Sequence, residues 1–109
     1  MSHRIAKLNS LIQQELGQII KEEVELPRDV FITISKVETS IDAKHAGVYV
    51  SAIPKDKTAS VFRKLSQNVY HLQQSLNKKL VMRFVPKIRF IIDHSEEHAA
   101  RIEKILLGT

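Results

Sequence analysis

The chain of 109 residues contains no cysteine and no tryptophan, and only three glycines and three prolines. Without cysteine there is no disulfide, no thiolate metal site and no thiol nucleophile. The glycines are too far apart for either glycine-rich loop that cradles nucleotide phosphates, G-x-x-x-x-G-K-S/T or G-x-G-x-x-G. Four Phe and two Tyr are too few for the aromatic cage of a sugar- or choline-binding site. Thiol chemistry is therefore excluded, and the sequence argues against nucleotide chemistry.

Long apolar runs are also missing. The longest are a few residues, far short of the roughly 20 that a membrane-spanning helix needs. No apolar secretory stretch follows the polar N-terminus. At 43% hydrophobic residues, the chain has enough apolar side chains for one core, as in a domain of roughly 100–150 residues. We expect one domain over residues 1–109 that acts in the cytoplasm and does not contact a membrane.

Positive charge is present in excess, and it is concentrated in one stretch. The chain has 17 Lys+Arg against 12 Asp+Glu, a net charge of +5. Residues 55–94 contain nine basic and two acidic residues, a balance of +7, whereas residues 1–29 and 95–109 each carry −1. Such concentration is typical of proteins that bind a polyanion, although a lysine-rich solvated helix face has the same composition.

Hydrophobic periodicity predicts the helices. Apolar residues recur every three or four positions over residues 3–23 and again over residues 58–80, so each stretch is expected to be an amphipathic helix. Ser95 can cap a short last helix, with two glutamates favourably placed in its first turn.

Alternation of apolar and polar residues predicts three strands, over residues 30–37, 46–52 and 88–92. The alternation changes parity near Val37, which indicates a bulge or bend. The order is α-β-β-α-β, and helices that link strands pack back onto one face of the sheet. The sequence therefore predicts a two-layer α+β domain with a three-stranded sheet.

One string resembles a metal-binding motif. His94-Ser95-Glu96-Glu97-His98 fits the H-x-x-E-H pattern, in which two histidines on a helix bind zinc and the glutamate activates water. Because His94 falls at the junction of strand and helix, we do not expect both imidazoles on one helical face. A solvated helix start is the favoured interpretation, and a small zinc hydrolase built on His94, Glu97 and His98 is the alternative. No other spacing pairs a nucleophile with a base, so the sequence predicts no catalytic residue, metal or cofactor.

Basic and polar side chains on the second helix favour RNA binding. Lys64, Asn68, His71, Ser75 and Lys78 are spaced by three or four residues and share one helical face. Lysine and arginine neutralise phosphates, while Asn and Ser can reach ribose or base edges. Few aromatic residues line this face, so we expect contacts with the backbone and shape of a structured RNA rather than base stacking. The expected mechanism is electrostatic docking of the face formed by residues 55–94, and the candidate contacts are Arg4, Arg28, Lys64, Asn68, His71, Lys78, Lys79, Arg83, Lys87 and Arg89.

Several segments, over about residues 3–107, form a distinctive series. They are Pro27-Arg28, Ile32-Thr33-Ile34-Ser35-Lys36-Val37-Glu38, Ser40-Ile41-Asp42, Ala46-Gly47-Val48-Tyr49-Val50-Ser51, Leu80-Val81-Met82-Arg83-Phe84-Val85-Pro86, Phe90 and Asp93, with Arg4 and Glu15 of the first helix. The V-Y-V-S strand and the R-x-V-P-x-x-x-F-x-x-D segment together are the most specific. In order and spacing, these segments resemble the ribosome-binding factor A family.

The resemblance implies a single KH-like (type II) domain with the order α-β-β-α-kink-α-β, its helices on one face of the sheet, plus the short C-terminal helix. It also implies a non-enzymatic monomer that binds the immature 30S small ribosomal subunit and 16S rRNA. That role supports late maturation of the subunit, including 5′-end processing, is associated with growth in the cold, and ends when a ribosome-dependent GTPase releases the protein. A general KH-type module that binds structured RNA, without ribosomal specialisation, is the alternative.

The two lines of inference differ over the second helix. Counting back from Val85-Pro86, the Ala-x-Gly kink of the family falls on Asn68-Val69-Tyr70 here. The apolar stripe passes through this place without a slip. Periodicity by itself therefore predicts an unbroken helix to Leu80, whereas the resemblance implies a kink.

Overall fold

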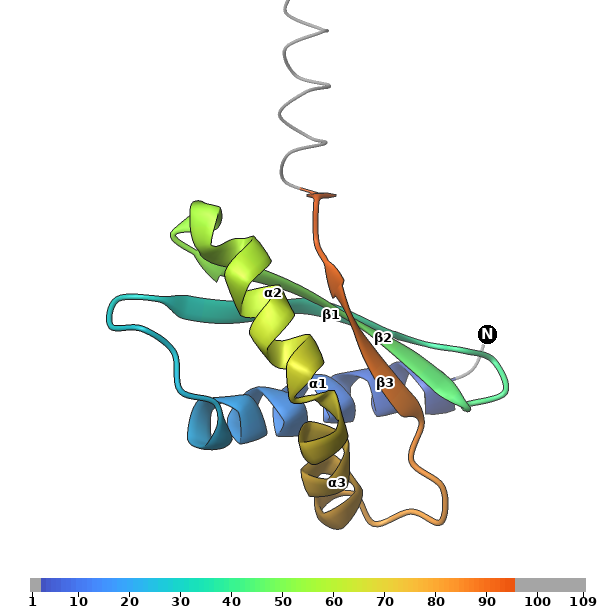
Figure 1. Cartoon of the computed structure of the whole chain (residues 1–109). Coiled ribbons are helices and arrows are strands. Elements are labelled where there is room, and N and C mark those ends of the chain that lie inside the picture. Colours follow the sequence, from blue (N-terminus) through green and yellow to red (C-terminus); the bar gives the residue numbers. More distant parts are fainter. Residues whose placement is uncertain (1–2, 96–109) are drawn as a thin grey trace, which may run out of the picture.

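The computed structural model describes residues 3–95 of the chain (Figure 1). The predicted first helix and all three predicted strands are present, and the last helix expected after Ser95 lies outside the described residues. The elements, in chain order, are α1 (His3–Glu23), β1 (Phe31–Thr39), β2 (His45–Ile53), the 3-10 turn η1 (Lys55–Lys57), α2 (Thr58–Gln67), α3 (Val69–Lys79) and β3 (Lys87–Ile92).

The sheet has the strand order β1-β2-β3. β1 and β2 are antiparallel neighbours joined by a short turn, whereas β2 and β3 are parallel. A parallel pair needs a long crossover, and η1, α2 and α3 provide it. α1 packs against β1, and α2 packs against β2 and β3, so the helices form one layer (Figure 1). The α+β, KH-like fold is confirmed, with helices on one face of the sheet, and no helix of residues 3–95 covers the other, open face.

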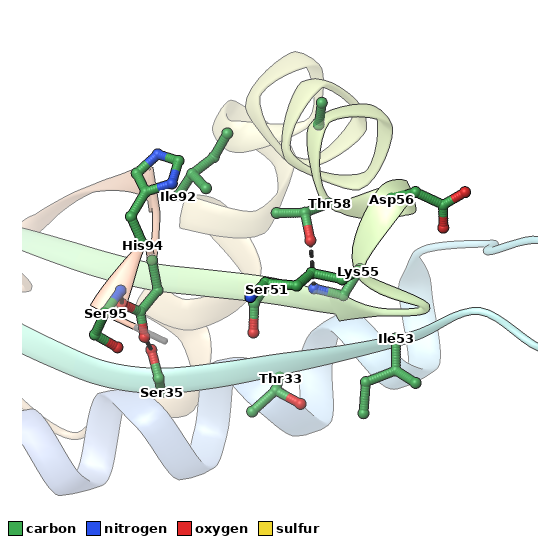
Figure 2. A pocket seen from close by; sticks show the side chains of 13 residues that line it. Thr33, Ser35, Ser51, Ile53, Lys55, Asp56, Thr58, Ile92, His94 and Ser95 are labelled. Atoms are coloured by element: carbon green, nitrogen blue, oxygen red, sulfur yellow. Dashed lines mark hydrogen bonds between the residues drawn. The ribbon is translucent and has the colours of Figure 1, made fainter. Parts of the chain in front are cut away.

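The change of parity in β1 occurs at Ser35. Ile34 pairs with Val50 and Lys36 pairs with Tyr49, so Ser35 is an extra residue in the strand. The predicted bulge is confirmed, two residues before its expected place. Ser35 donates a hydrogen bond of 2.5 Å to Asp93, just beyond the end of β3 (Figure 2). The bulge thus allows a β1 side chain to reach across the end of the sheet.

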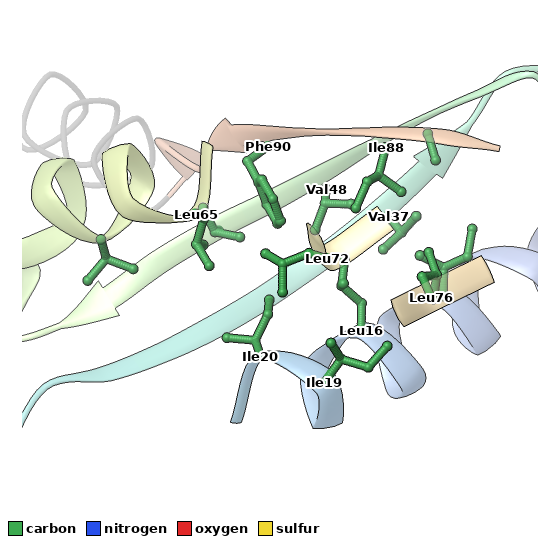
Figure 3. Close-up of a cluster of buried hydrophobic side chains, with 14 of the residues drawn as sticks. Leu16, Ile19, Ile20, Val37, Val48, Leu65, Leu72, Leu76, Ile88 and Phe90 are labelled. Carbon is green, nitrogen blue, oxygen red and sulfur yellow. The ribbon is translucent and has the colours of Figure 1, made fainter. Parts of the chain in front are cut away.

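The hydrophobic core lies between the helix layer and the sheet (Figure 3). Fully or almost fully buried side chains come from α1, from both crossover helices and from all three strands. Burial of each Leu or Ile side chain stabilises the fold by about 1.5–3 kcal/mol. Among residues 3–95, no helix combines the length and the apolar character needed to cross a membrane. Core residues drawn and labelled in Figure 3 are Leu16, Ile19, Ile20, Val37, Val48, Leu65, Leu72, Leu76, Ile88 and Phe90.

The long helix that periodicity predicts over residues 58–80 is broken at Asn68. This residue has φ −103° and ψ 10°, outside the helical region. Its backbone N–H is shared between the carbonyl oxygens of Lys64 and Leu65, at 3.2 and 3.1 Å, and its side-chain amide donates to Lys64 O at 2.8 Å. Asn side chains compete in this way with the hydrogen bonds of a continuing helix. The prediction of an unbroken helix is therefore wrong, and the break that the resemblance implies is present.

Periodicity missed the break because the break does not change the phase of the apolar stripe. Leu65, before the break, and Leu72, after it, are both fully buried. Both helices therefore keep their apolar side toward the same core, and a hydrophobic pattern records only that side.

Candidate nucleic-acid interface

Two of the predicted RNA contacts lie at the junction of α2 and α3, where they bond within the protein. The Lys64 ammonium donates a hydrogen bond to the carbonyl oxygen of Glu25, in the segment that follows α1. The Asn68 side chain, as described above, donates to the Lys64 carbonyl. Lys64 therefore fastens α2 to the α1–β1 connection, and its charge is held toward that connection.

A third predicted contact, His71, faces the acidic end of α1. Its Nε2 lies 2.7 Å from Oε1 of Glu23, and the Ser75 hydroxyl donates to the same oxygen at 2.8 Å. These bonds tie α3 to the last turn of α1. We call the residues that make these contacts the junction cluster: Glu23, Glu25, Lys64, Asn68, His71 and Ser75.

Five other predicted contacts follow one another from the end of α3 into β3. They are all exposed, and no Asp or Glu occurs from residue 77 to residue 92. Among the residues that the structure describes, none of the five forms an ion pair. We call residues 78–89 the basic segment, and its cations are Lys78, Lys79, Arg83, Lys87 and Arg89.

The loop within the basic segment is anchored at both ends. Leu80 and Pro86 are buried at its two ends. Between them and the core, the Gln73 side chain of α3 donates to Pro86 O at 3.1 Å and accepts from the Ile88 N–H at 2.8 Å. Both halves of this amide are satisfied, which fixes the start of β3 against α3. Residues 81–84 are exposed and project between these anchors.

Exposed aromatic surface on this loop is a feature that the sequence analysis missed. Phe84 is 75% exposed, and the Arg83 guanidinium lies 5.4 Å from its ring centroid, within the range of a cation–π contact. The run Val81-Met82-Arg83-Phe84-Val85 has the composition of a strand or a core segment, so composition does not distinguish it from buried chain. The length of the loop could have identified it, because the middle residues of a short connection between two buried residues stay exposed at the surface.

The turn between β1 and β2 extends the positive surface. The Lys87 N–H donates to Lys44 O at 2.9 Å, and Lys87 pairs in register with His45. Arg89, two residues along β3, lies on the same open face of the sheet. Sequence reasoning passed over Lys44 because residues 30–54 are neutral overall. The hydrogen bonding of the parallel strands brings this cation to the basic segment.

The remaining two predicted contacts, Arg4 and Arg28, cannot share one contact area. Both are exposed, but Arg4 lies in the first turn of α1 and Arg28 follows its last turn. At 1.5 Å per residue, the 21 residues of α1 separate these two positions by roughly 30 Å. Asn9 Oδ1 accepts the Thr39 N–H at 3.0 Å, which places the beginning of α1 beside the end of β1. Arg4 is therefore on the side of the β1–β2 turn, and Arg28 is on the side of the junction cluster.

A hollow of about 710 Å³ lies at the opposite end of the sheet, where β2 extends beyond β3 and α2 begins (Figure 2). Its polar lining includes Ser35 and Asp93, whose direct hydrogen bond leaves no base beside the serine. That bond, together with the Ser95 N–H at 2.9 Å, holds the pKa of Asp93 below its usual value.

The histidine string contributes two described residues to this hollow, His94 and Ser95. The proposed zinc partners of His94, Glu97 and His98, lie outside the described residues. Within residues 3–95, no group of three His, Asp or Glu side chains is arranged to hold a metal ion.

Comparison with known proteins gives the chain a family. A family model described as ribosome-binding factor A matches residues 4–106. A relative from Heliobacterium modesticaldum, named ribosome-binding factor A, is 35% identical over 105 residues, which cover 95% of this chain and 87% of the relative. The chain belongs to the ribosome-binding factor A family.

Structures of this family share the fold. A crystal structure of ribosome-binding factor A from Thermus thermophilus superposes with a TM-score of 0.69 at 28% identity, covering 81% of this chain and 93% of that chain. A homology model of the Thermus thermophilus ribosome-binding factor A, fitted into a cryo-EM map of a 30S complex of that protein, has a TM-score of 0.67 at 26% identity. It covers 87% of this chain and 97% of that chain.

For this member of the ribosome-binding factor A family, the ten predicted contacts do not form one face. Five lie in the basic segment, three belong to the junction cluster, and Arg4 and Arg28 lie at opposite ends of α1. The stretch 55–94 was expected to act as a single face, and this expectation fails because α2 begins at one end of the sheet and α3 leads to the other. The basic segment gathers five exposed cations in one stretch of chain, and the β1–β2 turn lies beside its β3 end.

Proposed function

We propose that the chain is a ribosome assembly factor that binds the immature 30S subunit through 16S rRNA. The observation that carries this proposal is the basic segment, with five exposed cations and no acidic residue between them. The homology model of the Thermus relative was fitted into a map of a 30S complex. This supports the choice of a ribosomal RNA over other polyanions.

Binding, without a chemical step, is the mechanism we propose. Lysine and arginine displace the counterions of phosphates, so the affinity depends strongly on salt. Lys87 and Arg89 are held by the hydrogen bonds of β3, whereas Lys78 and Lys79 lie in the last turn of α3, where the helix dipole favours cations. A rigid arrangement of these cations positions the protein on the backbone of a folded RNA.

For the finer role we propose what the resemblance to the family implies. By holding a junction of 16S rRNA until it matures, the protein supports late maturation of the subunit, including 5′-end processing. A ribosome-dependent GTPase then releases it. We propose that it acts in the cytoplasm as a monomer, without metal or cofactor and without enzymatic activity of its own.

Charge reversal at two places tests the proposal. In K78E/K79E, two cations of the basic segment become acidic. In K57E/R63E, the same change in net charge is made on η1 and α2, outside the basic segment and the junction cluster. Co-sedimentation of each purified protein with small ribosomal subunits, over a range of salt concentrations, should show a large loss for K78E/K79E and a small one for K57E/R63E. Equal losses would contradict a localised contact and indicate a general effect of net charge.

The alternative is a general module for structured RNA. Unlabelled structured RNA of unrelated sequence, added at increasing concentration, discriminates between the two functions. A specialised factor keeps its association with small subunits, whereas a general module is competed away at comparable nucleotide concentrations.

A further inference from the structure

The exposed tip of the basic segment combines apolar surface with concentrated positive charge. Phe84 is 75% exposed and Val81 is fully exposed, in a loop whose two ends, Leu80 and Pro86, are buried. The loop does not turn these side chains inward, although the core lies directly beneath its anchors. Several large apolar side chains exposed together on one loop, here Val81, Met82 and Phe84, are the kind of surface that marks an interaction site, whereas a single exposed residue is not.

The charge around the ring indicates which kind of molecule covers it. Every ionisable side chain from residue 78 to residue 89 is a Lys or an Arg, so the partner is a polyanion. An RNA offers a planar apolar surface only through its bases, and the bases of a continuous A-form helix are stacked and inaccessible to a side chain. The ring of Phe84 can therefore contact only a base that is unpaired.

We propose that Phe84 stacks on an unpaired RNA base while the lysines around it hold the flanking phosphates. The preferred target is then a helix interrupted by a bulged or unpaired nucleotide, and not a continuous helix. This inference deepens the proposed function and rests on it. It also changes the expectation, drawn from the sequence, that stacking is minor.

Arg83 has a definite place in this arrangement. Its guanidinium lies 5.4 Å from the centroid of the Phe84 ring, so it occupies one side of the ring and leaves the other for the base. A guanidinium in that position also faces the phosphate of a stacked nucleotide, since planar cations stack and donate hydrogen bonds at the same time. Gln73, which fixes the start of β3, acts as a positioning residue for the loop.

The test uses two RNA hairpins that differ by one nucleotide. One is fully paired, and the other has a single bulged 2-aminopurine. Fluorescence anisotropy gives the affinity of the full chain for each hairpin, and quenching of 2-aminopurine reports stacking directly. The wild type should bind the bulged hairpin about 10-fold more tightly, as expected for one base on an aromatic ring, and should quench its fluorescence.

Three variants separate stacking from charge. F84L keeps an apolar side chain and should lose both the preference and the quenching, whereas F84Y keeps a ring and should retain both. F31L makes the same substitution at a Phe that is 64% exposed at the other end of the sheet, and should behave as the wild type. K78E/K79E should weaken binding to both hairpins and keep the ratio between them.

The outcomes distinguish this inference from the proposed function. If the wild type shows no preference for the bulged hairpin, the inference is overturned, while binding to small subunits in the sedimentation assay leaves the proposed function intact. F84L could also lose small-subunit binding while the wild type shows no preference between the hairpins. That result would mean that the loop contacts a ribosomal protein, and it would overturn the inference as well. If neither hairpins nor subunits bind, the proposed function has failed.

Discussion

The junction cluster and the basic segment both contain predicted RNA contacts, but the side chains of the two regions differ in how available they are. In the junction cluster, Lys64 and His71 each contact a partner in or just after the last turn of α1. In the basic segment, the cations have no acidic neighbour along the chain and point outward. The difference comes from where α1 ends, because its last residue, Glu23, and the Glu25 carbonyl that follows it lie at the junction. A cation is free to bind RNA when the fold leaves it without a carboxylate or a carbonyl to hold.

The largest contrast is expected between two sets of alanine substitutions. K78A/K79A/R83A removes three exposed cations and should lower the affinity for small subunits by roughly 100-fold. It should also reduce the slope of log affinity against log salt by about 0.7–0.9 for each phosphate that is no longer neutralised. Its free energy of unfolding should stay near that of the wild type, because exposed cations contribute little to stability.

The matched variant K64A/H71A should show the reverse. Its free energy of unfolding should fall by about 1–2 kcal/mol, because two hydrogen bonds that join the helix layer are removed, and its affinity for subunits should change less than twofold. Urea denaturation and co-sedimentation, carried out on both variants, measure the two quantities. A strong loss of affinity in K64A/H71A would show that the junction cluster also contacts RNA, and the distinction between the two regions would be wrong.

Gln73→Leu tests whether the basic segment depends on its anchor. The substitution keeps the size of the side chain but removes the hydrogen bonds to Pro86 O and the Ile88 N–H. Two part-buried backbone groups are then left without partners, so the free energy of unfolding should fall by about 1–3 kcal/mol. Hydrogen exchange of the Ile88 amide should become faster, while amides of the junction cluster keep their protection. Uniform loss of protection would instead indicate that the two regions unfold together.

Asp93→Asn is expected to have the smallest effect and lies outside both regions. Hydrogen bonds from Ser35 and from the Ser95 N–H lower the pKa of the Asp93 carboxyl. A lowered pKa stabilises the fold above the pKa of the unfolded chain, near 3.9 for Asp, and this contribution disappears as the pH falls through the folded-state value.

The wild type should therefore be slightly more stable than Asp93→Asn at pH 6, and the difference should shrink below about pH 4. Thermal unfolding at both pH values measures it. Subunit binding should be unchanged, and a loss of binding would mean that the hollow takes part in the contact. A stability difference that persists at pH 2 would indicate that the hydroxyl bond, and not the charge, stabilises the end of the sheet.

Some elements could be read from the sequence because they depend on local pattern. The apolar spacing of residues 3–23 and the alternation of residues 46–52 identify a helix and a strand, since each follows the geometry of one element. The break at Asn68 could not be found in this way, because Leu65 and Leu72 stay in phase across it. Phe84 was missed for a related reason, since composition shows that a residue is apolar but not whether the loop around it reaches the core.

The sequence by itself determined the excess of cations in residues 55–94, the order of helices and strands, and the family to which the chain belongs. Tertiary structure decided which of those cations are available. The parallel pairing of β2 with β3 brings Lys44 to Lys87, and the packing of α1 against α3 brings Glu23 to His71. The reason is that a charge acts on whatever lies within a few ångströms in space, and residues that are neighbours in space here are 43 and 48 positions apart in the chain.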